Sequence, residues 1–263
     1  MTEQVTALGF LLPTLVEQKR IVAILDEAFE SIAAVKANAE KNLQNARAVY
    51  ESYLSSAFSN DGKGWQRKKL NEIAENISTG PFGTMLHKSD YIYAGIPLVN
   101  PMNIVNSRVV PSKKMMVSEE TRERLKAYML RAGDVVIGRR GELGRCALVT
   151  ATEEGWLCGT GSFFVRLSPK MNGEFFVALF GSQKFREILE ASSVGTTMSN
   201  LNHGILNSLE LPVPPIAEQL AIMEKANSVL KQTEIFESIY QRKLVALDEL
   251  KKSLLYQAFS GVL

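Results

Sequence analysis

Three arginines stand beside glycines in the segment GRRGELGR, and this arrangement could contact nucleic acid. Arg139, Arg140 and Arg145 carry planar guanidinium groups, each able to donate two parallel hydrogen bonds to a phosphate or to the edge of a guanine base. We expect Arg139 and Arg140 to read bases and Arg145 to contact the phosphate backbone. An ordinary solvated surface is the alternative for a basic loop of this kind.

A second basic stretch, GWQRKKL, holds Lys68 and Lys69, which we also expect to contact phosphates. The net charge of the chain is only +2, which neither requires nor excludes nucleic acid. Residues 61–212 contain 19 Lys and Arg against 15 Asp and Glu, a net +4, which leaves −2 for the rest of the chain. The positive excess therefore lies in the central segment.

Two polar loops complete the candidate DNA-binding set. The segment ISTGPFGTMLHKSDY turns at glycine and proline and then offers groups for phosphates and base edges. The segment VGTTMSNLNHG gathers hydroxyl, amide and imidazole groups between glycines. A plain surface loop remains the alternative for the first of them. The residues that we assign to DNA from these loops are Thr79, Gly80, Phe82, Thr84, His87, Lys88, Tyr91, Thr196, Thr197, Asn200, Asn202 and His203.

Catalytic and cofactor patterns are missing from the sequence. The glycines of GRRGELGR fit neither the dinucleotide-binding nor the P-loop spacing. Cys146 and Cys158 stand twelve positions apart without a Cys-x-x-Cys partner, so we expect two reduced thiols and no metal site. Neither histidine belongs to a recognisable nucleophile or metal motif. We therefore expect a protein without a cofactor that is not itself an enzyme.

Composition places the chain among ordinary globular proteins. Its 263 residues are 46% hydrophobic and 22% charged, which argues against disorder and against a disulfide scaffold. The sequence has no run of about 18 apolar residues and no signal-peptide pattern at its start. We therefore expect a cytoplasmic protein without membrane contact.

An internal repeat organises the chain. Residues 13–59 align with residues 214–260 at a constant offset of 201 and without a gap. The matched pairs at the first end are Pro13 with Pro214, Glu17 with Glu218, Gln18 with Gln219 and Ile21 with Ile222; at the second end, Ser52, Leu54, Ala57, Phe58 and Ser59 match Ser253, Leu255, Ala258, Phe259 and Ser260. Two unrelated amphipathic helices would not align in this way, although that alternative stays open.

Both copies predict one long helix each. Apolar residues in them step by three and four, as in the seam of a coiled coil, except where Thr233 and Lys251 stand in the second copy. Neither copy contains an internal proline or glycine after its first turn. A helix of about 45 residues is roughly 65 to 70 Å long. Such a helix needs a partner to cover its apolar seam.

The segment between the copies predicts a mixed domain. Short apolar runs such as DVVIG, CALVT and SFFVRL, bounded by glycine and proline, are typical of strands. Helices are expected around residues 69–76, 119–130 and 174–190. The predicted fold class is therefore α+β, with a mixed α/β globular domain between two long helices that form an antiparallel coiled coil. We divide the chain into an extension at 1–12, a helix at 13–60, the mixed domain at 61–212 and a second helix at 213–263.

The order helix, mixed domain, helix resembles the S subunit of type I restriction-modification enzymes. Segments that carry the resemblance are LPVPPIAEQLAI at the second junction and, in the central domain, GWQRKKLNEIAENISTG, LRAGDVVIGRRGELGRCALV and VGTTMSNLNHGILNSLELPVPPIAEQ. The resemblance covers nearly the whole chain and identifies residues 61–212 as a target recognition domain.

The resemblance implies a function in DNA recognition. A target recognition domain reads one half of a split site in double-stranded DNA, and the antiparallel helices set the distance between the halves. It also implies DNA-methyltransferase (modification) subunits and restriction subunits as partners, which carry out methylation and cleavage. We assign partner binding to Glu17, Gln18, Glu218 and Gln219, at the matched helix starts.

The chain departs from the family's usual plan of two recognition domains, because only a dozen residues precede Pro13. GFLLPTLVEQ resembles the end of a lost first domain, so we expect either a truncated chain or a half-size subunit that forms a homodimer to read a symmetric site. The main alternative is an assembly or decoy subunit, which binds modification subunits without recognising DNA. An enzyme of unknown type is a further alternative.

Overall fold

The computed structural model describes residues 13–59, 64–192 and 201–263, which form two compact units. The first, called here the helix unit, joins residues up to Tyr50 with Val229–Leu263, and the second, the sheet unit, is Glu51–Ser228. Helices α1 (Leu15–Ser59) and α7 (Ile216–Ser260) are 45 residues long and belong in part to each unit. The predicted α+β class with two long helices is confirmed, while the extension at 1–12 lies outside the described residues and the other domain boundaries stay predictions.

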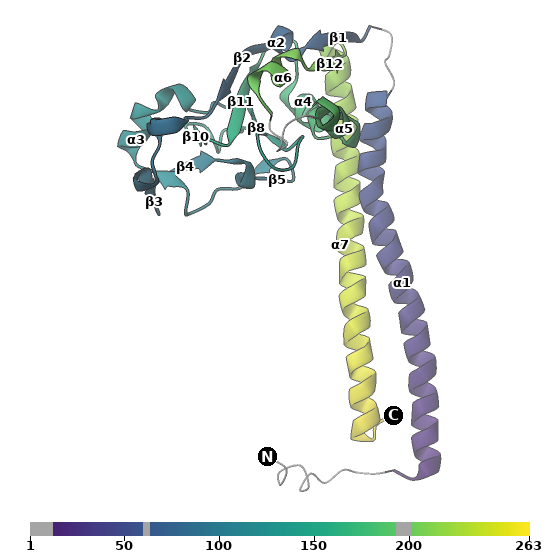
Figure 1. Ribbon diagram of the computed structural model, residues 1–263. Helices are drawn as coiled ribbons and strands as arrows, with labels where there is room; N and C mark the ends of the chain where they lie inside the picture. The colour runs from purple at the N-terminus through teal and green to yellow at the C-terminus, as the bar shows by residue number, and fades with distance from the viewer. Residues whose placement is uncertain (1–12, 60–63, 193–200) are drawn as a thin grey trace. The chain divides into compact units, whose positions relative to one another are not determined.

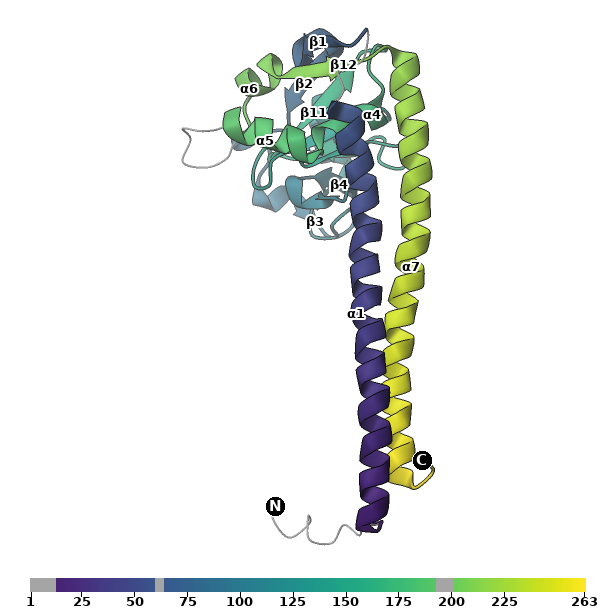
Figure 2. The ribbon, with the colours of Figure 1, turned by 90° about the vertical axis from the view of Figure 1, so that its right-hand side faces the viewer.

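Within the helix unit, α1 and α7 run side by side in opposite directions (Figures 1 and 2). Lys36 Nζ lies 2.9 Å from Asp248 Oδ1, and Arg47 Nε lies 3.3 Å from Glu237 Oε1. Residue numbers therefore rise along one helix as they fall along the other. Exposed ion pairs of this kind stabilise a fold little, so they report the direction of the helices more than they hold them together.

A narrow apolar seam holds the two helices together. Ile32, Ala39 and Ala46 are buried at intervals of seven residues, the period that keeps one helix face against a partner. Of the two polar exceptions in the second copy, Thr233 is buried, and Lys251 Nζ lies 4.9 Å from the centre of the Phe29 ring. The antiparallel coiled coil predicted from the repeat is therefore present.

The described residues of the sheet unit form two sheets of four strands and two strand pairs. The sheet with the longer strands, called here the larger sheet, has the order β2-β11-β8-β9, and all its neighbouring strands are antiparallel. The other sheet has the order β10-β4-β7-β3, in which only β10 and β4 are parallel. Strand β1 pairs with β12 and β5 with β6, both antiparallel. The strands are β1 (Gln66–Lys69), β2 (Ala74–Thr79), β3 (Tyr91–Ile92), β4 (Ile96–Val99), β5 (Ile104–Val105), β6 (Arg108–Val109), β7 (Met116–Val117), β8 (Asp134–Gly138), β9 (Cys146–Leu148), β10 (Leu157–Cys158), β11 (Ser162–Leu167) and β12 (Glu210–Val213).

The short helices differ from the sequence prediction. The helix expected at 69–76 is wrong beyond one turn, because α2 (Leu70–Ile73) gives way to β2, whose pairing with β11 overrides the local helical pattern. The helix expected at 119–130 is α3 (Glu119–Arg124) followed by the 3-10 turn Lys126–Tyr128. The helix expected at 174–190 is split into α4 (Gly173–Phe180) and α5 (Gln183–Ser192). The remaining elements are α6 (His203–Ser208) and 3-10 turns at Gly83–Met85, Lys88–Asp90 and Pro101–Asn103.

The core of the sheet unit is aromatic and includes both cysteines. Phe163 and Phe164 on β11 are fully buried, as are Phe176 and Phe180 on α4, whose rings stack with centroids 5.5 Å apart. Cys146 and Cys158 are free thiols, as predicted. Burial raises the pKa of Cys146 to about 12 and raises that of Cys158 as well, so both stay protonated and behave as small apolar side chains.

The ends of both long helices are anchored in the sheet unit. Phe58, near the end of α1, is 2% exposed and meets the ring of Phe175 edge-on at 5.5 Å. Trp65 Nε1 donates to Glu218 Oε1 near the start of α7 at 2.8 Å. Tyr53 donates its hydroxyl to the carbonyl of Ile222 at 3.2 Å. The chain thus leaves α1 and begins α7 at one shared anchor.

The repeat supplies a matched pair of variants that tests this anchor. Phe259, the repeat equivalent of Phe58, is 84% exposed. Phe58→Ala should lower the free energy of unfolding by about 3 to 5 kcal/mol, because it leaves a cavity against Phe175. In the monomer, Phe259→Ala should change the free energy of unfolding by less than about 0.5 kcal/mol. Urea unfolding followed by circular dichroism measures both, and equal losses would contradict the anchor.

Candidate nucleic-acid interface

The larger sheet brings together residues from three of the predicted segments. Arg139 directly follows β8, Thr79 ends β2 and His203 begins α6, and all three adjoin Phe163 on β11. The Arg139 guanidinium carbon lies 5.1 Å from the centre of the Phe163 ring, and the His203 ring meets the same ring edge-on at 5.1 Å. Thr79 is the direct cross-strand partner of Phe163. One end of the sheet therefore gathers a cation, an imidazole and a hydroxyl.

Gly80 contributes to the structure of this end of the sheet through its backbone. Its amide donates to the carbonyl of Ser162 at 3.0 Å, and the residue is buried. A Cβ at this position would stand 2.0 Å from the carbonyl oxygen of Gly159. Only glycine permits that approach of the two chains. Gly80 thus shapes the loop, and its assignment to DNA stays a prediction.

The backbone of Arg139 is fixed on both sides, whereas its side chain is not fully engaged. Its amide donates to Gly161 at 2.9 Å, and its carbonyl accepts from the amide of Leu201 at 3.0 Å. Its Nε is buried and has no hydrogen-bond partner among the described residues. Burial lowers the pKa of the guanidinium, and the neighbouring charge of Arg140 lowers it further. Arginine nevertheless remains charged at neutral pH, so the group can still bind an anion or a base edge.

The loop before α6 is only partly described. Asn202 caps α6, because its side-chain oxygen accepts from the amide of Ile205 at 2.9 Å. The cap fixes the start of the helix and with it the exposed His203. Thr196, Thr197 and Asn200 lie outside the described residues, so their assignment to DNA stays a prediction.

The loop after Gly80 exposes most of its predicted contacts. Phe82, Thr84, His87 and Lys88 are exposed, whereas Tyr91 is half-buried in β3 and burial raises the pKa of its hydroxyl. The loop thus offers an aromatic face and a cation, as the sequence predicts for a surface that contacts DNA.

Arg124 on α3, which the sequence analysis did not single out, ties this loop to the domain. Its Nη1 donates to the carbonyl of Met85 at 2.7 Å, and its Nη2 lies 3.2 Å from Asp90 Oδ1. Asp90 also accepts from the amide of His87 at 2.7 Å. No local pattern could have revealed Arg124, because its partners lie more than thirty residues earlier in the chain.

The remaining basic residues differ in their exposure and in their bonds within the protein. Lys69 is exposed and Lys68 half-buried on β1, and Arg140 is exposed. Arg145 is engaged within the protein: its Nη1 donates to the carbonyl of Pro101 at 3.1 Å and its Nη2 lies 3.0 Å from Glu142 Oε2. Contact of Arg145 with a phosphate would compete with these bonds.

The four residues assigned to partner binding divide by repeat copy. In the first copy, Glu17 pairs with Arg20 at 2.7 Å, and Gln18 Nε2 donates to the carbonyl of Pro13 at 2.8 Å. In the second copy, Glu218 binds Trp65 and Gln219 is fully buried.

The Gln219 amide makes three hydrogen bonds inside the sheet unit. Its Nε2 donates to the carbonyls of Pro214 and Lys170 at 2.8 and 2.9 Å, and its Oε1 accepts from the amide of Asn172 at 2.8 Å. The bond to Pro214 repeats the bond from Gln18 to Pro13. Gln219 therefore joins α7 to the mixed domain.

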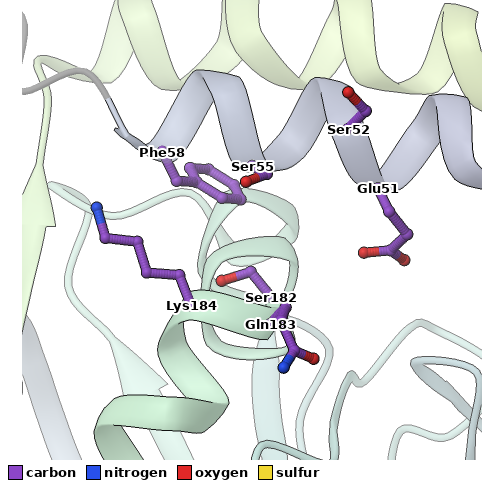
Figure 3. Close-up of a pocket in the computed structure, with 7 residues that line it drawn as sticks. All are labelled: Glu51, Ser52, Ser55, Phe58, Ser182, Gln183 and Lys184. Carbon is purple, nitrogen blue, oxygen red and sulfur yellow. The ribbon is translucent and has the colours of Figure 1, made fainter.

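A cavity of about 250 Å³ lies between the end of α1 and the start of α5 (Figure 3). Its lining residues are Glu51, Ser52, Ser55, Phe58, Ser182, Gln183 and Lys184. Ser182 is not a free nucleophile, because its hydroxyl donates to the carbonyl of Leu179 at 2.6 Å at the break between α4 and α5. The ionisable residues of this lining are Glu51 and Lys184, with no histidine or cysteine beside them.

Residues 13–59, 64–192 and 201–263 contain neither a metal-binding cluster nor a membrane-spanning helix. No group of three or more His, Cys, Asp or Glu in these segments is arranged to hold a metal ion. In the same segments, no helix is both long and apolar enough to cross a membrane.

Comparison with known proteins gives a consistent result. Residues 62–242 match the family model described as type I restriction modification DNA specificity domain. The MjaVIII specificity subunit of Methanocaldococcus jannaschii is 22% identical over 240 residues, which cover 85% of this chain and 56% of that protein. The EcoBI specificity subunit of Escherichia coli is 23% identical over 278 residues, covering 96% and 58%. The chain thus spans little more than half the length of these relatives.

Solved structures share the fold. The HsdS subunit from Thermoanaerobacter tengcongensis superimposes with a TM-score of 0.65 at 20% identity, covering 97% of this chain and 61% of that one. A chain from a structure described as the basis of complex assembly and conformational transition of the type I R-M system gives a TM-score of 0.77 at 20% identity, covering 96% and 61%.

Proposed function

Because this chain belongs to the family of type I restriction-modification DNA specificity domains, we propose that it reads one half of a bipartite DNA site and docks modification subunits through its helices. The observation that carries the proposal is the family match over the same segment that gathers Arg139, Thr79 and His203 at one end of a sheet. The chain itself is proposed to be non-catalytic, with methylation and cleavage supplied by modification and restriction subunits.

Base reading is assigned to the loops at the end of the larger sheet. Arg139 supports this role because its Nε has no hydrogen-bond partner among the described residues, in contrast to the guanidinium of Arg145. Arg140 beside it is exposed. The exposed Lys69 and Lys88 would contact phosphates, which sets the register of the domain on the duplex without sequence preference. A base contact by arginine should therefore be separable from a phosphate contact by lysine.

Variants of Arg139, Arg140 and Lys69 test this division. Arg139→Ala or Arg140→Ala should cost about 1 to 3 kcal/mol of binding free energy at one base position and relax the preference there. Lys69→Ala should weaken binding to all sequences alike. Competition binding of the purified assembly to randomised duplexes measures both effects. Uniform weakening by both arginine variants would contradict base reading.

Docking of modification subunits is assigned to an apolar stripe on α7. Ile235, Ile239 and Leu250 are exposed, and their spacings of four and eleven residues return to one face of the helix. Three large apolar side chains in line on one face indicate a surface that a partner protein covers. Val245 is equally exposed but lies on another face, so it provides a matched control.

A single charge placed within the stripe should weaken docking of a modification subunit. Ile239→Lys should lower recovery of a co-expressed modification subunit by about tenfold or more, because a lysine would be desolvated in the interface. Val245→Lys should leave recovery unchanged. Affinity purification measures recovery, and unchanged helical content by circular dichroism shows that the variant folds. Equal recovery with both variants would contradict the stripe.

The same preparation addresses the decoy alternative. An assembly subunit would recover the modification subunit but select no sequence from random DNA. A recognition subunit would do both.

A second recognition domain is assigned to the end of the helix unit where α1 starts and α7 ends. The Arg20 guanidinium donates to the carbonyl of Leu263 there, at 2.8 Å. The repeat equivalents of this end form the anchor in the sheet unit: Met223 is 5% exposed there, whereas its equivalent Val22 is 55% exposed. Phe259 and Gln18 likewise lack the cover that Phe58 and Gln219 have. Among the described residues, the start of α1 and the end of α7 thus repeat the anchor without its cover.

A second copy of the chain could pack against this uncovered anchor and form a homodimer. A charge on the uncovered anchor should then oppose association. We expect Phe259→Glu to shift the chain toward the monomer, with Val245→Lys as control, in sedimentation equilibrium. A wild-type chain that stays monomeric at all concentrations would contradict the homodimer.

A further inference from the structure

Two neighbouring phenylalanines on β11 each contact the guanidinium group of an arginine. Phe163 lies 5.1 Å from the guanidinium carbon of Arg139, and Phe164 lies 5.2 Å from that of Arg166. Both rings are fully buried, and their side chains point to opposite faces of the sheet because they are consecutive on one strand. Each of the two buried rings on this strand thus has a cation–π partner.

The two pairs differ in whether the arginine also bonds to other groups of the domain. Arg166 is engaged inside the domain, since its Nε lies 3.2 Å from Asp134 Oδ1 and its Nη2 donates to the carbonyl of Met129 at 3.1 Å. Arg139 has no ion pair in the part of the chain that the structure describes, and its buried Nε is without a hydrogen-bond partner there. One arginine is therefore structural, whereas the other retains donors for a ligand.

We propose that Phe163 is a positioning residue that determines base preference, because its ring aims the Arg139 guanidinium at the DNA. This inference rests on the proposed DNA-reading function. The ring attracts the cation and sets the plane of the guanidinium, while the bonds of the Arg139 backbone to Gly161 and Leu201 fix where the side chain starts. His203 packs on the same ring and restrains it from another side.

Positioning matters because bidentate reading of a base depends on orientation. An arginine held in place loses little conformational freedom when it binds, and a guanine in the wrong place cannot meet both of its donors. A freely rotating arginine would still attract phosphate, but it would discriminate less between bases. Phe163 is thus expected to act on preference more than on overall affinity.

The two phenylalanines allow a matched experiment. Phe163→Leu and Phe164→Leu remove the same ring from equally buried sites, so they should lower the melting temperature by similar amounts. In competition binding of the purified assembly to a pool of randomised duplexes, Phe163→Leu should reduce discrimination at one base position by about three- to tenfold, the size expected for a lost cation–π contact. Phe164→Leu should leave the preference unchanged.

Several outcomes decide the inference. It is overturned if Phe163→Leu keeps the full preference of the wild type, or if both variants lose preference equally, which would mark a structural role for the ring. Should Phe163→Leu fail to fold, Phe163→Met keeps more of the apolar volume without the ring and is expected to show the same loss. If the wild-type assembly itself selects no sequence, the proposed function fails together with this inference; if it selects a site that Phe163→Leu also selects, only this inference fails.

Discussion

The pairing of β1 with β12 is the constraint on which the rest of the sheet unit depends. Strand β1 follows α1 and β12 precedes α7, and their four antiparallel residue pairs bring the two junctions together. Because α1 ends and α7 begins at the same place, the two helices run antiparallel where they lie side by side. The contact between Phe58 and Phe175, the bond from Trp65 to Glu218 and the three bonds of Gln219 all form around this junction.

The candidate interface depends on the larger sheet in a similar way. Strand β11 is central to it, and residues 79, 139 and 203 meet at Phe163 only because β2 and β8 flank that strand. Gly80 and Gly159 allow two chain segments to approach each other beside it. The candidate interface therefore consists of side chains on loops, and the ends of buried strands determine where those loops begin.

The sequence was informative where structure is local or repeated. The gapless repeat and its seven-residue apolar period predicted both long helices and their association, because an unpartnered seam of this length cannot stay exposed. The same reasoning failed at residues 69–76, where pairing with β11 outweighed a local helical pattern. It also missed Phe163 and Arg124, whose importance arises from contacts across more than twenty positions of the chain.

Gln219 shows a related limit. A glutamine matched between two repeats suggests a shared external partner, yet in the second copy its amide is used up by carbonyl and amide groups of the domain itself. The sequence pattern is the same in both copies, so it could not predict that the glutamine of the second copy is fully buried.

Thr233 has a consequence for how the two helices find each other. A seam of alanine and isoleucine alone tolerates sliding, since one alanine fits against a helix much like the next one. A buried hydroxyl interrupts that equivalence, because a displaced alignment would place it against a different neighbour with different opportunities for hydrogen bonding. A buried threonine at this one position therefore favours the alignment in which its present neighbours surround it.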